Sequence, residues 1–238
     1  MTKVFQVRGP FNIQDLDSAP DLPGLYVWYA RFRVGEADWD EVYAGGNERA
    51  AFHLMKALRE HSLKFGRQEL DVRVQSNFSC LWKGALREEQ SAKWKTEEAN
   101  EEEDGFSERV GPALADNRRR EFLVEFLESS FPYFSSPLYL GKASDQTLRE
   151  RLRQHSNHFL ELWEKYIQDQ EFALRIQNPK DFAERAFKLG FAPEDLFCMT
   201  ITVDPAIARD LKRSEISLLI ESAEWLLNRW ATPILGRR

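Results

Sequence analysis

The chain has few cysteines and no long apolar run. Cys80 and Cys198 are its only cysteines among 238 residues, too few for a disulfide framework or for a zinc site built from four thiolates. No apolar stretch reaches the roughly 18 residues that a membrane-spanning helix needs. The first ten residues also lack the apolar stretch of a signal peptide. We therefore expect a chain of the reducing cytoplasm with no membrane partner.

The formal net charge of −6 at first argues against a nucleic-acid partner. The negative charge is concentrated in residues 96–108, which hold seven acidic residues and no basic one, so the remainder of the chain carries +1. Basic residues cluster at "NRRR" (117–120), "RERLR" (149–153) and the terminal "GRR". Each cluster has the composition of an ordinary solvated helix face. Because the local field governs association, the net charge leaves a DNA partner open.

Five segments have the composition of β-strands. Residues 21–34 ("DLPGLYVWYARFRV") are rich in β-branched and aromatic residues and are entered through a Pro-Gly turn, and residues 40–46 ("DEVYAGG") look like the partner strand of a hairpin. Residues 70–78, 137–143 and 194–204 are the other predicted strands.

Amphipathic periodicity predicts helices along most of the remaining chain. The longest begins after Asp145, which we place as its N-cap, and a shorter one ends at Gly190. Strands and helices are mixed without the rhythm of a doubly wound sheet, so an α+β fold is expected. The predicted helices cover residues 47–65, 85–98, 117–131, 145–168, 178–190 and 208–231.

One strand-to-helix unit gathers residues suited to binding an anion. Tyr139 and Gly141 lie in the predicted strand "PLYLGKA", and Arg151 and His155 follow in the next helix. These two side chains are four residues apart, so they stand on the same helical face. A guanidinium and an imidazole placed there can both contact a phosphate.

In this unit the sequence resembles the GIY-YIG nuclease superfamily, whose members include homing endonucleases, repair nucleases and restriction enzymes. Its first signature corresponds to Gly24, Leu25 and Tyr26, and its second to Tyr139, Leu140 and Gly141. The "YLGKA" segment is similar to the form that is common among the restriction enzymes. The resemblance implies a small antiparallel sheet flanked by helices and a DNA-cleaving activity, of restriction or host-defence type.

The resemblance also implies a set of catalytic residues. It assigns a metal-binding glutamate to Glu224, within "EWLLNRWATPILG", and it places Gly236 where the family has a terminal asparagine. Glu221, one turn earlier, is a rival ligand. The implied metal is Mg²⁺ or Mn²⁺, which prefer carboxylate oxygen. The catalytic residues implied are Tyr26, Tyr139, Lys142, Arg151, His155 and Glu224.

The two signature strands are separated by about a hundred residues, where the family has a tight hairpin. One interpretation makes residues 1–30 and 137–238 the nuclease core and residues 31–136 a large, mainly helical insertion. The other pairs the Tyr26 strand with Tyr43, in a degenerate repeat spanning residues 41–78. We favour the insertion, in which residues 96–108 form an acidic linker.

The residues suggest roles in phosphodiester hydrolysis. Arg151 would contact the phosphate as its charge grows, and Lys142 would assist or bind phosphate. Tyr26, Tyr139 and His155 are alternatives for orienting or deprotonating the attacking water. The insertion would recognise DNA, form a homodimer or bind a protein partner. A non-catalytic module that binds nucleic acid or protein is the alternative function. The expected DNA contacts are Arg118, Arg119, Arg120, Arg149, Arg153 and Arg237.

Overall fold

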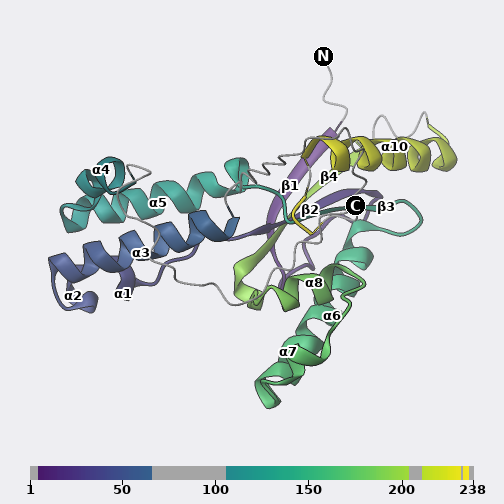
Figure 1. The fold of residues 1–238 in the computed structure, drawn as a ribbon. Helices are drawn as coiled ribbons and strands as arrows, with labels where there is room; N and C mark the ends of the chain where they lie inside the picture. Colours follow the sequence, from purple (N-terminus) through teal and green to yellow (C-terminus); the bar gives the residue numbers. More distant parts are fainter. Residues whose placement is uncertain (1–4, 66–105, 204–210, 232, 236–238) are drawn as a thin grey trace, which may run out of the picture.

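The computed structural model describes residues 5–65, 106–203, 211–231 and 233–235. These residues form an α+β fold around one antiparallel sheet with the strand order β1-β4-β2-β3 (Figure 1). Three of the strands were expected from the sequence, whereas β1 was not. The strands are β1 (Phe5–Asn12), β2 (Gly24–Ala30), β3 (Tyr139–Ala143) and β4 (Leu196–Val203).

The β2 strand pairs with β3 on one side and with β4 on the other. In the pairing with β3, Tyr26 lies opposite Gly141 and Trp28 lies opposite Tyr139. Tyr43 does not lie in a strand but in the short helix α2 (Glu41–Ala44). The expected strand at residues 40–46, and the alternative hairpin built on it, are therefore wrong.

Helices cover both faces of the sheet (Figure 1). On one face the side chains of Tyr26, Trp28 and Ala143 join the main hydrophobic core with residues of α6 (Leu148–Gln168) and α8 (Phe182–Lys188). The short helices α7 (Phe172–Arg175) and η2 (Pro193–Asp195) follow α6 and α8. The opposite face is covered by α10 (Arg213–Ala231), whose Ile220 is buried.

Local signals in the sequence set the ends of α6. Its N-cap is Thr147, whose hydroxyl accepts from the Glu150 backbone N–H while the Glu150 carboxylate accepts from the Thr147 N–H. This capping box satisfies two amides of the first turn, so the expected cap at Asp145 is wrong by two residues. No helix in the described part of the chain is long and apolar enough to span a membrane.

The described part of residues 31–136 is helical and lies to one side of the sheet (Figure 1). It has a hydrophobic cluster of its own, in which Phe32, Leu54, Leu114 and Val124 are buried. The expected strand at 70–78, the helix at 85–98 and most of the acidic tract lie outside the described residues. Its helices are α1 (Glu36–Trp39), α2, α3 (Asn47–Phe65), α4 (Phe106–Val110), η1 (Gly111–Leu114) and α5 (Asn117–Phe134).

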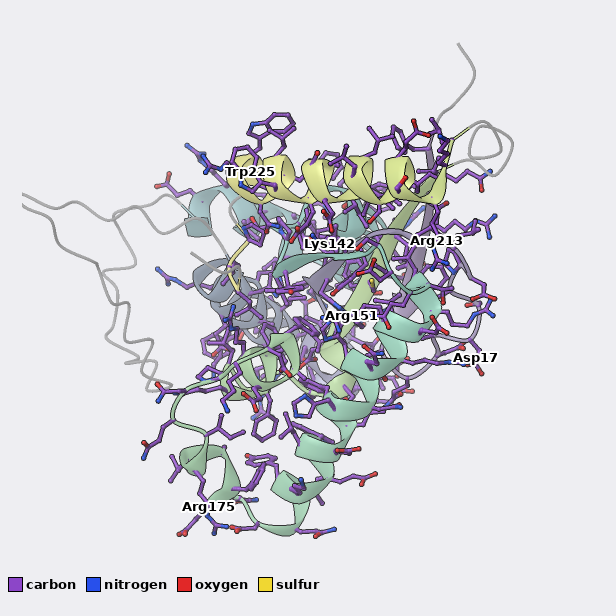
Figure 2. The ribbon with its side chains drawn as sticks, turned by 90° about the vertical axis from the view of Figure 1, so that its right-hand side faces the viewer. Asp17, Lys142, Arg151, Arg175, Arg213 and Trp225 are labelled. Carbon is purple, nitrogen blue, oxygen red and sulfur yellow. The ribbon has the colours of Figure 1, made fainter. Side chains whose placement is uncertain are left out.

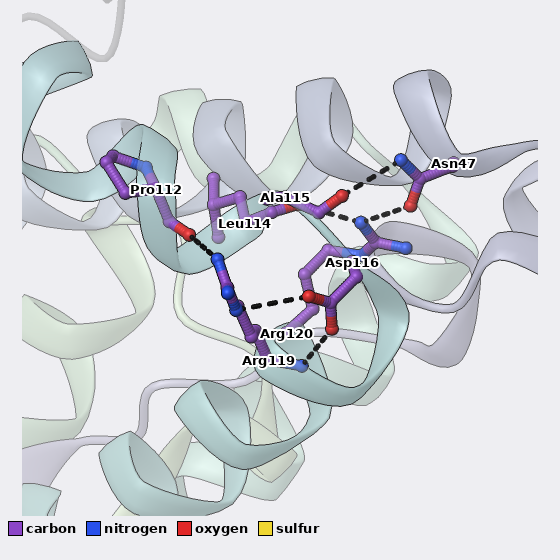
Figure 3. Close-up of polar contacts among 7 residues, drawn as sticks. All are labelled: Asn47, Pro112, Leu114, Ala115, Asp116, Arg119 and Arg120. Carbon is purple, nitrogen blue, oxygen red and sulfur yellow. Dashed lines mark hydrogen bonds and ion pairs between the residues drawn. The ribbon is translucent and has the colours of Figure 1, made fainter.

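Arg120 holds these helices together from the inside (Figure 3). The residue is fully buried. Its guanidinium donates to the Trp39 carbonyl at 2.7 Å, and to the Leu114 carbonyl and the Asn47 side-chain oxygen at 2.8 Å each. These bonds join α1, α3 and η1 to α5. The expectation that Arg120 contacts DNA is therefore wrong in this structure, because the guanidinium is occupied and shielded from solvent.

Candidate active site

A buried tyrosine–histidine pair lies beneath β2 and β3. The Tyr26 hydroxyl is 2.7 Å from Nε2 of His155, which α6 brings under the sheet. The Tyr139 ring packs beside both, with its centroid 6.2 Å from that of Tyr26 and 6.1 Å from that of His155. Phe182 of α8 closes the group from the far side, 5.6 Å from the imidazole. Three of the expected site residues are thus brought together.

Burial changes the acid–base properties of this pair. Loss of solvation raises the pKa of Tyr26 well above its usual value, and electrostatic repulsion from Tyr139 adds to this, while the charge of the Arg151 guanidinium lowers the pKa. Loss of solvation, followed by the charge of Arg151, lowers the pKa of His155 to about 4. Both groups are therefore neutral near pH 7, and we assign the tyrosine hydroxyl as donor and Nε2 of His155 as acceptor.

Arg151 lies one turn before His155 on α6 and is half-buried. Its guanidinium donates to the side-chain oxygen of Gln154 at 3.0 Å. Gln154 in turn donates to the Gln146 side chain at 2.9 Å. The two glutamines fix the guanidinium without neutralising it, so its charge is available to an anion.

A second charged group lies on the other face of the sheet. Lys142 of β3 forms ion pairs with two carboxylates of α10, Glu221 at 3.2 Å and Glu224 at 3.7 Å. The Asn228 amide donates to the Glu224 carboxylate at 3.2 Å. Glu221 and Glu224 are three positions apart, so they share a helical face. One ammonium therefore lies between two carboxylates.

The expected site residues thus form two groups on either side of β3. Successive side chains of a strand point to opposite faces, so Lys142 points toward α10 whereas Tyr139 and Gly141 face α6. Figure 2 agrees, with Lys142 directly beneath α10 and Arg151, on α6, farther from α10. Since β3 is an edge strand, both groups border the same edge of the sheet.

Gly141 allows Tyr26 to reach across β3. A Cβ atom at this position would collide with the Tyr26 hydroxyl and would lie 2.5 Å from its Cζ. Both contacts are closer than real Cβ atoms allow. Only glycine therefore leaves room for the hydroxyl to meet His155.

Replacing Gly141 with alanine should displace Tyr26 and destabilise the protein by about 1 to 3 kcal/mol, the usual cost of overpacking a core. Gly111→Ala is the control, because its Cβ would meet no atom within 4 Å. Equilibrium unfolding in denaturant measures both. Equal effects of the two substitutions would show that Tyr26 does not require the space at Gly141.

The expected DNA-contacting arginines differ in their surroundings. Arg118 is exposed on α5, whereas Arg119 is bound to Asp116 at 3.1 Å. Arg149 donates to the Ala19 carbonyl at 2.9 Å. Arg153 forms an ion pair with the exposed Asp17. Exposed ion pairs are weak and exchange readily, so Arg118, Arg119 and Arg153 remain able to contact phosphate, whereas the Arg149 guanidinium is partly buried on a backbone carbonyl. Arg237 lies outside the described residues.

Several residues of the site were not expected from the sequence. Asn228 follows Glu224 by four positions, a spacing at which helical side chains meet, so their contact could have been predicted from the sequence. The spacing of Gln154 from Arg151 is likewise that of neighbours on a helix. The contact of Phe182 with His155 could not have been predicted, because it depends on how α8 packs against α6. No group of three or more His, Cys, Asp or Glu side chains that would hold a metal ion occurs within the described ranges.

Comparison of the chain with protein-family models, with curated proteins and with solved structures found no match. The function is therefore argued from the residues and their geometry. The main evidence for a function is the presence of two groups of polar residues at the edge formed by β3. In the first, Arg151 lies beside the buried Tyr26–His155 hydrogen bond. In the second, two carboxylates surround Lys142.

Proposed function

We propose that this chain is a divalent-metal-dependent endonuclease that hydrolyses DNA phosphodiester bonds, as its resemblance to GIY-YIG nucleases implies. The observation that carries the proposal is the Tyr26–His155 hydrogen bond, with the Arg151 guanidinium close enough to influence the pKa of both groups. The packing of a hydrophobic core does not require a cation such as Arg151 beside a proton donor and a proton acceptor. Hydrolysis of a phosphodiester requires both groups, because the attacking water must lose a proton and the developing phosphate charge must be stabilised by a cation.

The proton path begins at Tyr26. Its oxygen keeps a lone pair free while its proton is donated to His155, so it can accept a proton from the attacking water as His155 takes the phenolic one. The raised pKa of Tyr26 argues against a phenolate acting alone. The water oxygen bonds to phosphorus, the bond to the leaving oxygen breaks, and that oxygen takes up a proton from the solvent while His155 releases to the solvent the proton that it received. Arg151 stabilises the phosphate charge that develops meanwhile.

Glu224 is the proposed metal ligand, with Glu221 as a second carboxylate. Their fit to Mg²⁺ or Mn²⁺ is supported by the ion pairs of both with Lys142, because two carboxylates within reach of the same ammonium would also be within reach of one cation. Carboxylate oxygens suit both ions, and water and phosphate would supply the remaining ligands. A bound cation supplies positive charge to the phosphate. Asn228 orients Glu224, a task for which the glycine at position 236 has no side chain.

One observation favours the alternative function, a non-catalytic module that binds nucleic acid or protein. The Lys142 ammonium already forms ion pairs with both carboxylates and balances one of their two negative charges, and the carboxylates lie on the face of β3 opposite Tyr26. If the two groups cannot meet on one phosphate, Arg151 and the exposed arginines would still hold DNA without cleaving it. Binding without cleavage is the expected property of that module.

Incubation of the purified chain with supercoiled plasmid in Mg²⁺ or Mn²⁺ tests the proposal. We expect nicked and linear DNA, and a rate at least about 100-fold lower for Arg151→Ala and for Glu224→Gln, since each removes charge stabilisation in the transition state. Arg175→Ala and Glu164→Gln are matched controls on exposed helix faces, and both should cleave at the wild-type rate. Gel shifts in EDTA report binding separately. DNA binding without cleavage by the wild type would replace the proposal with the alternative.

A further inference from the structure

Helix α10 carries a second apolar face that points away from the sheet. Leu218 is 64% exposed, Trp225 55% and Trp230 72%, and Leu219 and Leu226 lie between them. Figure 2 shows the Trp225 indole on the side of α10 remote from the rest of the molecule. Two exposed tryptophans and three leucines on one helix are more apolar surface than a solvated helix normally presents.

We call this face the outer face of α10, and four of its five apolar side chains are arranged symmetrically about Ser222, whereas Trp230 has Ser214 as its counterpart. Leu219 and Trp225 lie three positions before and after it, and Leu218 and Leu226 lie four positions before and after it. Residues three or four apart are helical neighbours, so all of these side chains surround Ser222. The serine is the small residue at the centre of the face, where another helix can approach most closely.

The charges of the outer face are arranged with opposite signs about the same centre. Glu215 lies seven positions before Ser222 and Arg229 seven positions after it, which is about two turns in each direction. Arg229 lies over the Trp225 ring, with its guanidinium carbon 3.9 Å from the ring centroid, and so stays on this face. A second α10 running antiparallel across Ser222 would place Arg229 on Glu215 twice. A parallel arrangement would place like charges together.

We propose that the chain forms a twofold-symmetric homodimer through antiparallel packing of α10, with the axis at Ser222. An isologous interface requires a self-complementary surface, and the outer face is self-complementary in its charges and in the positions of its four central apolar side chains. A helix of 19 residues is about 28 Å long, so one helix pair buries less than a standard interface of about 1,600 Å². The dimer is therefore reversible, with a dissociation constant on the order of micromolar.

This dimer is separate from the proposed nuclease activity and does not rest on it. Glu221 and Glu224 contact Lys142 on another side of α10, so the carboxylates remain uncovered. It also differs from the dimer contact expected through residues 31–136. Phe122 and Phe126 are exposed on α5, but they show no comparable pattern of charges that would select a second copy.

Charge reversal tests the proposed pairing. Sedimentation of the full chain between about 1 and about 200 µM should show a concentration-dependent monomer–dimer equilibrium. Glu215→Arg and Arg229→Glu should each weaken it about tenfold, because each places like charges opposite one another twice. The double substitution should restore it to within about threefold of wild type. Glu215 also accepts from the Lys212 backbone N–H, so thermal unfolding is measured to confirm that the single variants fold.

Crosslinking tests the position of the axis. In a Cys80→Ser background, where the remaining Cys198 is buried, Ser222→Cys should be joined to its partner by a short bifunctional maleimide. Ser214→Cys is the matched control, since antiparallel packing would place the two cysteines about 24 Å apart along the helix axis. A monomer at all concentrations, a dimer unaffected by charge reversal, or equal crosslinking at 214 and 222 would overturn the proposal.

Discussion

Replacing Arg120 with alanine should lower the free energy of unfolding by about 3 to 5 kcal/mol. The substitution leaves the Trp39 and Leu114 carbonyls and the Asn47 side chain without their donor inside the protein. A buried polar group that loses its partner costs about 1 to 3 kcal/mol, and the emptied space costs more. Denaturant unfolding followed by circular dichroism measures the loss, which should fall on the helices of residues 31–136.

Arg118→Ala is the matched control for this prediction, because Arg118 lies on the same first turn of α5 and is exposed. It should change the free energy of unfolding by less than about 0.5 kcal/mol. Arg120→Lys should be intermediate, since an ammonium cannot reproduce the fork of the guanidinium. Similar losses for Arg118→Ala and Arg120→Ala would show that the buried bonds of Arg120 contribute little.

The run "NRRR" shows how composition alone can mislead. Its three arginines are identical as letters and were all expected to contact DNA. The helical period nevertheless distinguishes them, because Arg120, Val124 and Leu127 recur on one side of α5 whereas Arg118 falls on another. Val124 is buried, so the apolar pattern already pointed to the side on which Arg120 lies. The signal was in the sequence and required the phase of the helix rather than its charge.

The pairing of β2 with β3 was predictable from the two Tyr-containing signatures, although the chain between them is long. The failed strand at residues 40–46 has a local cause. The Asp40 carboxylate accepts from the Val42 and Tyr43 amides, and Gly45 adopts a left-handed conformation with φ of 80°. These caps at both ends form a short helix from residues whose composition suits a strand. The Glu41 backbone N–H also donates to the Asn117 side-chain oxygen at 3.0 Å, which joins the short helix to α5.

The candidate site was predictable as a set of residues but not as an arrangement. Strand alternation already separates Lys142 from Tyr139 and Gly141, since odd and even positions face opposite sides. By contrast, the ion pairs of Lys142 with Glu221 and Glu224 depend on where α10 crosses the sheet. The depressed pKa of His155 depends on the packing of Phe182 and the sheet above it. No spacing within one helix encodes either contact.

The stability of the protein should depend on pH through His155. Its pKa falls from 6.5 to about 4 on folding, so the unfolded chain binds the proton more tightly. Stability is then fully present above pH 6.5 and is lost as the pH falls from 6.5 toward 4. A shift of this size corresponds to about 3 kcal/mol. Protonation of His155 at Nε2 would also break the hydrogen bond that this nitrogen accepts from the Tyr26 hydroxyl.

His155→Gln isolates this contribution, because glutamine does not titrate whereas the other groups of the protein are unchanged. The difference in free energy of unfolding between wild type and variant should be constant above pH 7. This difference should then shrink as the pH falls below 6.5, because protonation of His155 destabilises the wild type, whereas the variant has no titrating group at this position. Titration of the His155 imidazole by nuclear magnetic resonance provides the independent measurement. A midpoint near 6.5, with a difference that does not vary with pH, would mean that His155 is solvated and that its bond to Tyr26 is not a feature of the folded protein.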